Sequence, residues 1–578
     1  METRTCQNCK NDFVIESDDF SFYEKIQVPP PTFCPECRFV RRLSFRNERS
    51  LYHRTCDSCK QKKIFMYPES TPFPVFCKEC WWQDVWDPFS YGMQYDFNQP
   101  FFPQFYELMK LVPRPGTIQQ GNNIQSDYSN RVTDMRNCYL VFGTIASEYS
   151  MYSNIINGSK ECMDDFYAVG SEQCYECIDV SKCYRCYFCC ESQECAESYF
   201  LYNCRNCTNC FGCVNVRNKS NCIFNQQYSP EDYKKFIEEF KKGGREAIAE
   251  AQAKIEELKK DAIHPWMVCR SVSNSSGNWI EHSENAVHVF SSNDCEDVKY
   301  GYSLSKAKDS MDYSFWGSGS ELVYDTINTG IQCSNIKWNH ESWTGDSDLT
   351  YCTNCHSSKN LFGCIGLKNA EYCVFNVQYS KEDYEALVTK IISQMKELPY
   401  IDAHARAYSY GEFYPYEFSP FAYNETVAQE FFPLSKEEAQ SRGYLWVDEV
   451  EKKYQATVDA NNLPNTIEEV DEAICKEVIS CLNNGKTSTK CTSAFKIIPD
   501  ELAFYKRFSL PLPQYCSNCR HFNRLSKRNP LKLWPRSCIC DNQSHGHSGM
   551  CPNEFETSYS PDRPEKVYCE QCYQREVI

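Results

Sequence analysis

The most regular pattern of hydrophobic and polar positions is a ladder with a period of twelve residues. Small side chains fill one column of the ladder, and bulky apolar side chains fill the next. The first column is Cys138, Ser150, Cys162, Cys174, Cys186, Ser198, Cys210 and Cys222, and the second is Tyr139, Met151, Met163, Tyr175, Tyr187, Tyr199, Phe211 and Ile223. A fixed period with like residues stacked on like predicts a β-solenoid, in which each coil packs on its neighbours.

A weaker copy of this pattern follows later. Residues 361–384 match residues 210–233, and both segments lead into apolar residues at helical spacing. Turn lengths around Cys295, Cys333 and Cys352 are less regular, so we expect bent or bulged coils there. The chain therefore contains an internal duplication of a solenoid followed by a helix.

Three segments interrupt or flank the two copies. Residues 229–265 begin with Ser229 as a helix N-cap, and Gly243-Gly244 predicts a division into two helices. Residues 81–115 are crowded with aromatic residues, which form either a platform for stacked bases or, as we favour, a plug on the end of the domain that follows. Residues 400–470 are aromatic and proline-rich, and we interpret them as a strap over other elements.

Four CxxC pairs occupy the first eighty residues. They are Cys6/Cys9, Cys34/Cys37, Cys56/Cys59 and Cys77/Cys80. Two thiolates on a tight turn fill two corners of a zinc tetrahedron, and a second pair closes it. Order along the chain pairs the first with the second and the third with the fourth. Both sites are then closed and structural, and their binding energy stabilises the fold.

Composition indicates the cellular compartment and the chemical state of these cysteines. The chain of 578 residues has 39 cysteines and a net charge of −17. We find no apolar run long enough to span a membrane and no apolar signal core at the N-terminus, which predicts a cytoplasmic protein with metal thiolates rather than disulfides. The negative charge means that nucleic-acid binding requires a local basic patch. In the ladder, columns three positions apart produce CxxC automatically, so we favour buried apolar filler over metal ligands there.

The first module resembles a known family. The CQNC motif at Cys6, Phe13, residues 22–25, the proline-rich TFCPECR and Arg41-Arg42 resemble the bacterial "probable zinc-ribbon" domain, a treble-clef module. The resemblance implies a knuckle, a hairpin and a helix that opens at the second CxxC. The overall layout is similar to cysteine-rich proteins of small-genome uncultivated bacteria.

The C-terminal end repeats this module. The matching cysteines are Cys491, Cys516, Cys519 and Cys538, offset by 482 residues, and Cys551, Cys569 and Cys572, offset by 492. The counterpart of Cys6 is Ser488, so either Cys481 substitutes or the site is weak or empty. A ten-residue insert carries Cys540, His545 and His547, which can compete as ligands. We expect three to four Zn²⁺ per chain.

Arginines recur after the second CxxC of each module. The first set is Arg38, Arg42, Arg46 and Arg49, and the second is Arg520, Arg524 and Arg528. Spacings of four, four and three predict guanidinium groups on one helical face. This face either contacts nucleic acid or a protein partner, or is solvated, or docks on the acidic remainder of the same chain.

The predicted fold class is mainly β and multidomain, a duplicated β-solenoid with helical inserts flanked by treble-clef or zinc-ribbon modules. The segments are a tandem zinc module (1–90), an aromatic cap or linker (91–135), the first solenoid (136–228), a helical connector (229–265), a second, irregular solenoid (266–379), a helix (380–399), the aromatic strap (400–470) and the C-terminal tandem zinc module (471–578).

No motif of a nucleotide-binding loop, zinc protease or serine hydrolase is found, so we predict no enzyme. The leading hypothesis is a non-catalytic zinc-binding scaffold or adaptor whose basic helices contact nucleic acid or an acidic protein surface. One alternative is metal or thiol buffering by the cysteine ladders. Another is a purely structural solenoid capped by zinc modules.

Overall fold

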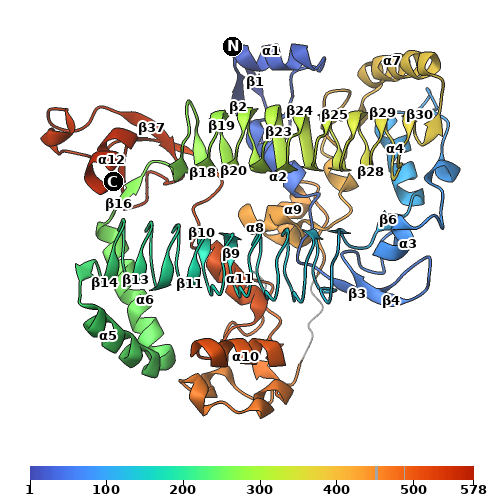
Figure 1. Cartoon of the computed structure of the whole chain (residues 1–578). Helices are drawn as coiled ribbons and strands as arrows, with labels where there is room; N and C mark the ends of the chain where they lie inside the picture. The colour runs from blue at the N-terminus through green and yellow to red at the C-terminus, as the bar shows by residue number, and fades with distance from the viewer. Residues whose placement is uncertain (449–453, 487–488) are drawn as a thin grey trace.

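Two ladders of parallel strands form the body of the molecule. The computed structural model describes residues 1–448, 454–486 and 489–578. It is strand-rich, and its largest sheets have 15 and five strands. Figure 1 shows the ladders side by side, the second returning along the molecule in the direction opposite to the first. Within the described ranges, no helix combines the length and apolar character needed to cross a membrane.

The first ladder has the predicted twelve-residue register. Met151 bridges Met163, Met163 bridges Tyr175, and Tyr175 bridges Tyr187. The ladder begins at β7, before the predicted start at residue 136. The sequence pattern did not reveal these first turns because they carry no cysteine column. Its strands are β7 (Gln119–Gln120), β8 (Val132–Thr133), β9 (Phe166–Val169), β10 (Ile178–Ser181), β11 (Tyr184–Tyr187), β12 (Ala196–Tyr199), β13 (Thr208–Phe211), β14 (Ser220–Ile223) and β15 (Gln226–Gln227).

A three-residue repeat lies inside the twelve-residue period. Corner residues adopt left-handed backbone conformations, with φ of 54° at Glu176 and 52° at Asp179. The residue after each corner, Cys177 or Val180, is buried in the interior. Asn, Asp and Gly tolerate this conformation best, and they are frequent at the corners. Carboxylate side chains such as those of Glu176 and Asp179 therefore stand at these corners.

Small side chains fill the interior of the first ladder. Its cysteines are free thiols, and Cys177 Sγ lies 3.3 Å from the carbonyl oxygen of Cys186. Inward serines accept the backbone N–H of the next turn, as Ser171 Oγ does from Cys183 at 3.2 Å. Asp165 takes the same role, since its Oδ1 accepts the N–H of Cys177 at 2.7 Å, and burial raises the pKa of this carboxyl well above its usual value.

The second ladder contains the expected irregularity. Met311, Tyr324, Lys337 and Thr350 pair in succession, each thirteen residues after the last. Elsewhere in this ladder most turns return to twelve residues, as from Thr350 to Phe362. The ladder runs from β17 (Cys269–Arg270) to β31 (Val377–Gln378) and includes the long strands β23 (Lys308–Gly317) and β24 (Glu321–Thr329).

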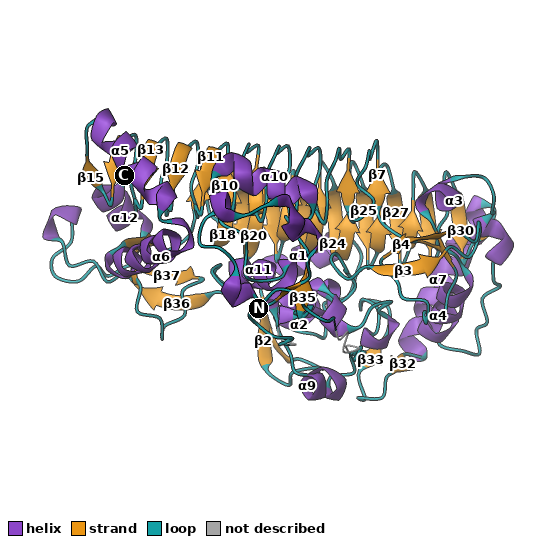
Figure 2. Ribbon diagram, turned by 90° about the horizontal axis from the view of Figure 1, so that it is seen from below, coloured by secondary structure: helices purple, strands orange, loops and turns teal. Residues whose placement is uncertain are grey.

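Helices connect and cover the ladders. Ser229 caps α5 (Pro230–Lys242), and α6 (Gly244–Asp261) follows it, so the predicted division at the glycine pair is confirmed. Aromatic helix α4 (Phe101–Leu111) packs on the last turns of the second ladder, beside α7 (Lys381–Glu397), as Figure 2 shows. Phe101 lies 5.1 Å from Tyr351 and 5.3 Å from Phe375 between ring centroids. The aromatic plug therefore covers the second ladder rather than the first.

Polar contacts join the two ladders directly. They are Arg131 with Glu341 at 2.6 Å, Gln193 with Glu281 at 2.8 Å and Tyr167 with Ser303 at 3.1 Å. A cavity of about 310 Å³ remains between the ladders, and the charged pair Arg131–Glu341 forms part of its lining.

Candidate metal centres and the arginine helices

In the part of the chain that the structure describes, four groups of four cysteines bring their sulfur atoms within 4.8 Å of one another. They are Cys6, Cys9, Cys34 and Cys37; Cys56, Cys59, Cys77 and Cys80; Cys481, Cys491, Cys516 and Cys519; and Cys538, Cys551, Cys569 and Cys572. Cys9 Sγ and Cys34 Sγ, for example, lie 3.7 Å apart. Metal–sulfur bonds of about 2.3 Å give a tetrahedron with edges of about 3.8 Å, so this spacing suits a four-coordinate ion.

The four groups share one local frame. The third cysteine of each is the N-cap of a helix, namely α2 (Pro35–Leu43), α3 (Lys78–Trp82), α11 (Ser517–Leu525) and α12 (Glu570–Val577). The backbone N–H of that cysteine donates to the sulfur of the first cysteine at 3.2 or 3.3 Å in every group. Both the helix N-terminus and this N–H stabilise a thiolate.

Close packing of the thiols shifts their pKa values in opposite directions. Hydrogen bonds with Cys34 and Cys37 lower the pKa of the Cys6 thiol far below its usual value. Hydrogen bonds with Cys37 and Cys6 raise the pKa of Cys34. The thiolate form is therefore favoured at Cys6 and the thiol form at Cys34. Zinc binds thiolates, so an ion held by all four sulfurs displaces the remaining thiol protons, and its affinity falls as the pH falls.

Cys481 completes the third group. The N–H of Cys516 donates to Cys481 Sγ at 3.3 Å, as the N–H of Cys34 donates to Cys6 Sγ at 3.2 Å. Cys481 is thus the structural counterpart of Cys6. Ser488, the counterpart by sequence offset, lies outside the described residues. A fixed offset failed here because the first two ligands of this group are ten residues apart instead of three.

The insert between the first two cysteines of the fourth group adds a fifth cluster of donors. Cys540, His545, His547 and Cys572 also bring their ligand atoms within 4.8 Å of one another. Cys572 belongs to this cluster and to the fourth group. The histidines therefore lie beside the four-cysteine group rather than replacing its members.

Helix α2 docks on the second ladder through a buried ion network. Its pairs are Arg38–Asp312 at 2.7 Å, Arg41–Asp325 at 3.4 Å, Arg41–Glu412 at 3.3 Å, Arg42–Asp312 at 3.0 Å and Arg42–Asp325 at 2.8 Å. Asp312 and Asp325 are corner residues on successive turns of the ladder, so Arg42 bridges two turns. No side chain in the network is more than 4 % exposed.

Helix α11 docks on the first ladder in the same way. Arg520 pairs with Asp164 at 2.9 Å, and Arg524 pairs with Asp164 at 2.9 Å and with Glu176 on the next turn at 3.1 Å. Beyond the end of the helix, Arg528 Nε and Nη2 both bond Asp179 at 2.8 Å, and burial raises the pKa of that carboxyl. Each arginine helix therefore binds the ladder that is more distant from it in sequence, α2 beside β23 and α11 beside β9 (Figure 1).

The predicted arginine face differs from the observed one in two respects. Helix α2 ends at Leu43, so Arg46 and Arg49 lie beyond it, and the prediction of four guanidinium groups on one helix was wrong. Arg46 pairs with Glu48 at 2.7 Å, and Arg49 donates to Asn154 at 2.7 Å. The face is also buried against the chain's own carboxylates, which is the docking alternative raised from the sequence.

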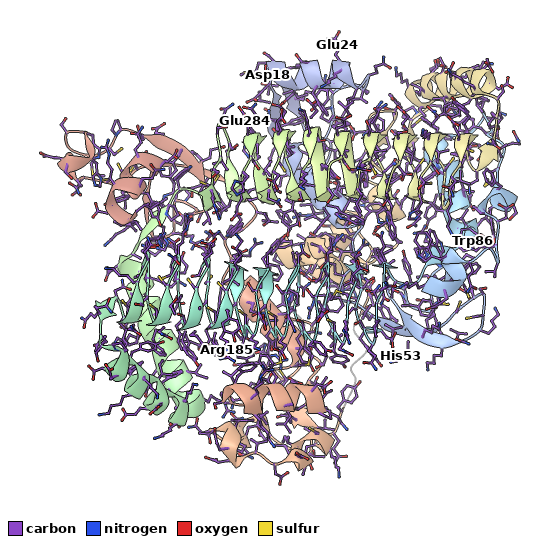
Figure 3. All side chains as sticks on the ribbon, viewed as in Figure 1. Asp18, Glu24, His53, Trp86, Arg185 and Glu284 are labelled. Carbon is purple, nitrogen blue, oxygen red and sulfur yellow. The ribbon has the colours of Figure 1, made fainter. Side chains whose placement is uncertain are left out.

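The cysteines and charged residues of the ladders form contacts between successive turns. Among the described residues, no three ladder cysteines form a group with all sulfurs within 4.8 Å. Exposed charges pair between turns, as Arg185 does with Glu197 at 3.1 Å (Figure 3). The acidic corners that bind the arginines were a signal that sequence reasoning missed, since Asp164 and Glu176 stand one turn apart.

Comparison with known proteins adds no relative to this picture. No protein-family description matches the chain, and no curated protein matches it. The geometry of the cysteines and arginines therefore carries the functional argument.

Proposed function

We propose that this protein is a non-catalytic, zinc-binding scaffold built on two β-solenoids that run in opposite directions. In this proposal the treble-clef or zinc-ribbon modules act as clamps, and their arginine helices bind the solenoid corners of the same chain. The reciprocal arginine–carboxylate networks carry the proposal. A phosphate-binding face needs accessible guanidinium groups, whereas Arg38 and Arg42 are at most 2 % exposed.

The metal sites support a structural role. Four thiolates complete the tetrahedral shell that zinc prefers and leave no position for a substrate or water. In each group a helix begins at the third cysteine, so the metal would fix where the helix starts. The first and third groups thereby orient the arginines of α2 and α11, which links metal binding to the docking of each module.

Metal or thiol buffering by the ladders is less well supported. A buffering protein needs sulfurs gathered around further ions, and among the described residues no three ladder sulfurs lie within 4.8 Å of one another. Ladder thiols also contact backbone carbonyls, as Cys177 does. Their stacking agrees with a role as apolar filler.

Metal content per chain tests the proposal. Protein purified without oxygen should contain one zinc for each four-cysteine group, and Cys59→Ser should remove one. Cys186→Ser, in the ladder, should remove none. A metal content far above the number of groups would favour buffering. Tight binding of single- or double-stranded nucleic acid by the metal-loaded chain would favour the nucleic-acid hypothesis and contradict the self-docked scaffold.

A further inference from the structure

The C-terminal insert adds a cluster of four potential metal ligands beside the fourth cysteine group. Cys540, His545, His547 and Cys572 converge on one point, and Cys572 also belongs to the four-cysteine group beside it. We propose that these residues bind a second zinc ion and that the Cys572 thiolate bridges the two ions. The C-terminal module then contains a binuclear centre, which goes beyond the scaffold role.

The distances suit a four-coordinate ion. Cys540 Sγ lies 3.2 Å from His545 Nδ1, and Cys572 Sγ lies 3.5 Å from His547 Nε2. Zinc bonds of about 2.3 Å to sulfur and about 2.0 Å to nitrogen give a tetrahedral edge of about 3.5 Å. Cys540 and Cys572 are at most 1 % exposed and His545 is 8 % exposed, so these three donors are shielded from solvent, whereas His547 is half-buried.

The outward nitrogen of each histidine has an acceptor. His545 Nε2 lies 3.2 Å from Glu576 Oε2, and His547 Nδ1 lies 2.9 Å from the carbonyl oxygen of Gly549. Asn542 Nδ2 donates to Glu576 Oε2 at 3.2 Å and so holds the carboxylate that faces His545. A proton on each outward nitrogen leaves Nδ1 of His545 and Nε2 of His547 free to bind metal. Metal-bound histidines in proteins are oriented by such carboxylate and carbonyl partners.

Charge favours two ions over one. A single Zn²⁺ with four thiolates leaves a net charge of −2. Two Zn²⁺ with the five thiolates of both groups and two neutral imidazoles leave −1. A thiolate sulfur keeps further lone pairs after binding one ion, so it can bind a second. The insert therefore supplies one extra thiolate and two neutral donors for one extra ion.

Zinc analysis of the full chain, purified without oxygen, tests this assignment. We expect five zinc ions per chain, and zinc-edge X-ray absorption should show zinc–zinc scattering. The double variant His545→Ala/His547→Ala should lose one ion and the scattering, whereas His53→Ala, on an exposed strand of the N-terminal module (Figure 3), should lose neither.

Four ions in the unmodified chain, or five without zinc–zinc scattering, would overturn the bridged centre and leave the scaffold proposal intact. Because these two measurements use the unmodified chain, they decide the question even where the double variant fails to fold. Absence of zinc from the N-terminal four-cysteine groups of the unmodified chain would instead contradict the scaffold proposal.

Discussion

Replacement of Arg42 by methionine tests whether the buried network holds α2 on the second ladder. Arg42 Nη1 lies 3.0 Å from Asp312 and 2.8 Å from Asp325, and all three side chains are at most 1 % exposed. The network contains three arginines and three carboxylates. Loss of one guanidinium group therefore leaves one unbalanced negative charge in the interior.

The expected cost is about 3–5 kcal/mol, the usual penalty for removing one partner of a buried ion pair. Burial raises the pKa of Asp325 even with Arg42 present, so in the variant this carboxyl takes up a proton more readily. A raised folded-state pKa favours the protonated form in the folded protein. The variant should therefore lose stability as the pH rises and recover part of it as the pH falls. Arg42→Met/Asp325→Asn keeps two arginines and two carboxylates and should be more stable than Arg42→Met.

Hydrogen exchange of peptides from α2, β23 and β24 is the suitable assay, because a chain with several modules need not unfold in one step. Arg42→Met should speed exchange there by about a hundredfold or more at pH 7, since each 1.4 kcal/mol is about tenfold. The control is Lys532→Met, which breaks an exposed pair with Glu36 at 3.0 Å and should cost at most about 1 kcal/mol. Equal exchange in the two single variants, or faster exchange in the double variant than in Arg42→Met, would refute the reasoning.

Four further predictions concern the ladders and the metal groups. Burial would raise the pKa of Glu341, but the charge of Arg131 and the contact with His340 outweigh it and lower the pKa to about 2. Glu341→Gln should therefore lower the free energy of unfolding by about 3 kcal/mol at pH 7. Denaturation measured at pH 7 and below pH 4 should show that this difference from wild type becomes smaller as the carboxylate takes up its proton. Asp165→Ser should raise the free energy of unfolding by about 1–3 kcal/mol, because serine keeps the acceptor and removes a buried carboxyl with a raised pKa. This stabilisation should grow as the pH rises, and an unchanged melting temperature would count against this account. A zinc chelator at pH 7 should expose α2 and α11 to exchange while the ladder strands stay protected, and simultaneous loss of both would contradict independent ladders. Cys34→Ser should abolish metal binding in its group. Cys186→Ser should change the free energy of unfolding by at most about 1 kcal/mol, since the next turn already carries Ser198 in that column.

The sequence by itself determined the local repeats. Stacked turns place residues twelve apart in contact, so the twelve-residue period predicts the pairing of Tyr175 with Tyr187. Cysteines three residues apart reach one ion because the turn between them is short, which is why Cys6 and Cys9 belong to one group. The break between α5 and α6 follows likewise from two adjacent glycines. Each of these features depends on neighbours along the chain.

Only the tertiary structure decided which surfaces meet. Arg42 and Asp325 are 283 residues apart, and no spacing rule links a module to the ladder that it binds. Their pairing depends on charge balance in a buried interface, where three guanidinium groups meet three carboxylates. The choice of Cys481 over the position of Ser488 has the same origin, since a loop of altered length brings a different sulfur to the same N–H of a helix. Periodicity determines contacts within a repeat, whereas complementarity of charge and shape determines contacts between repeats.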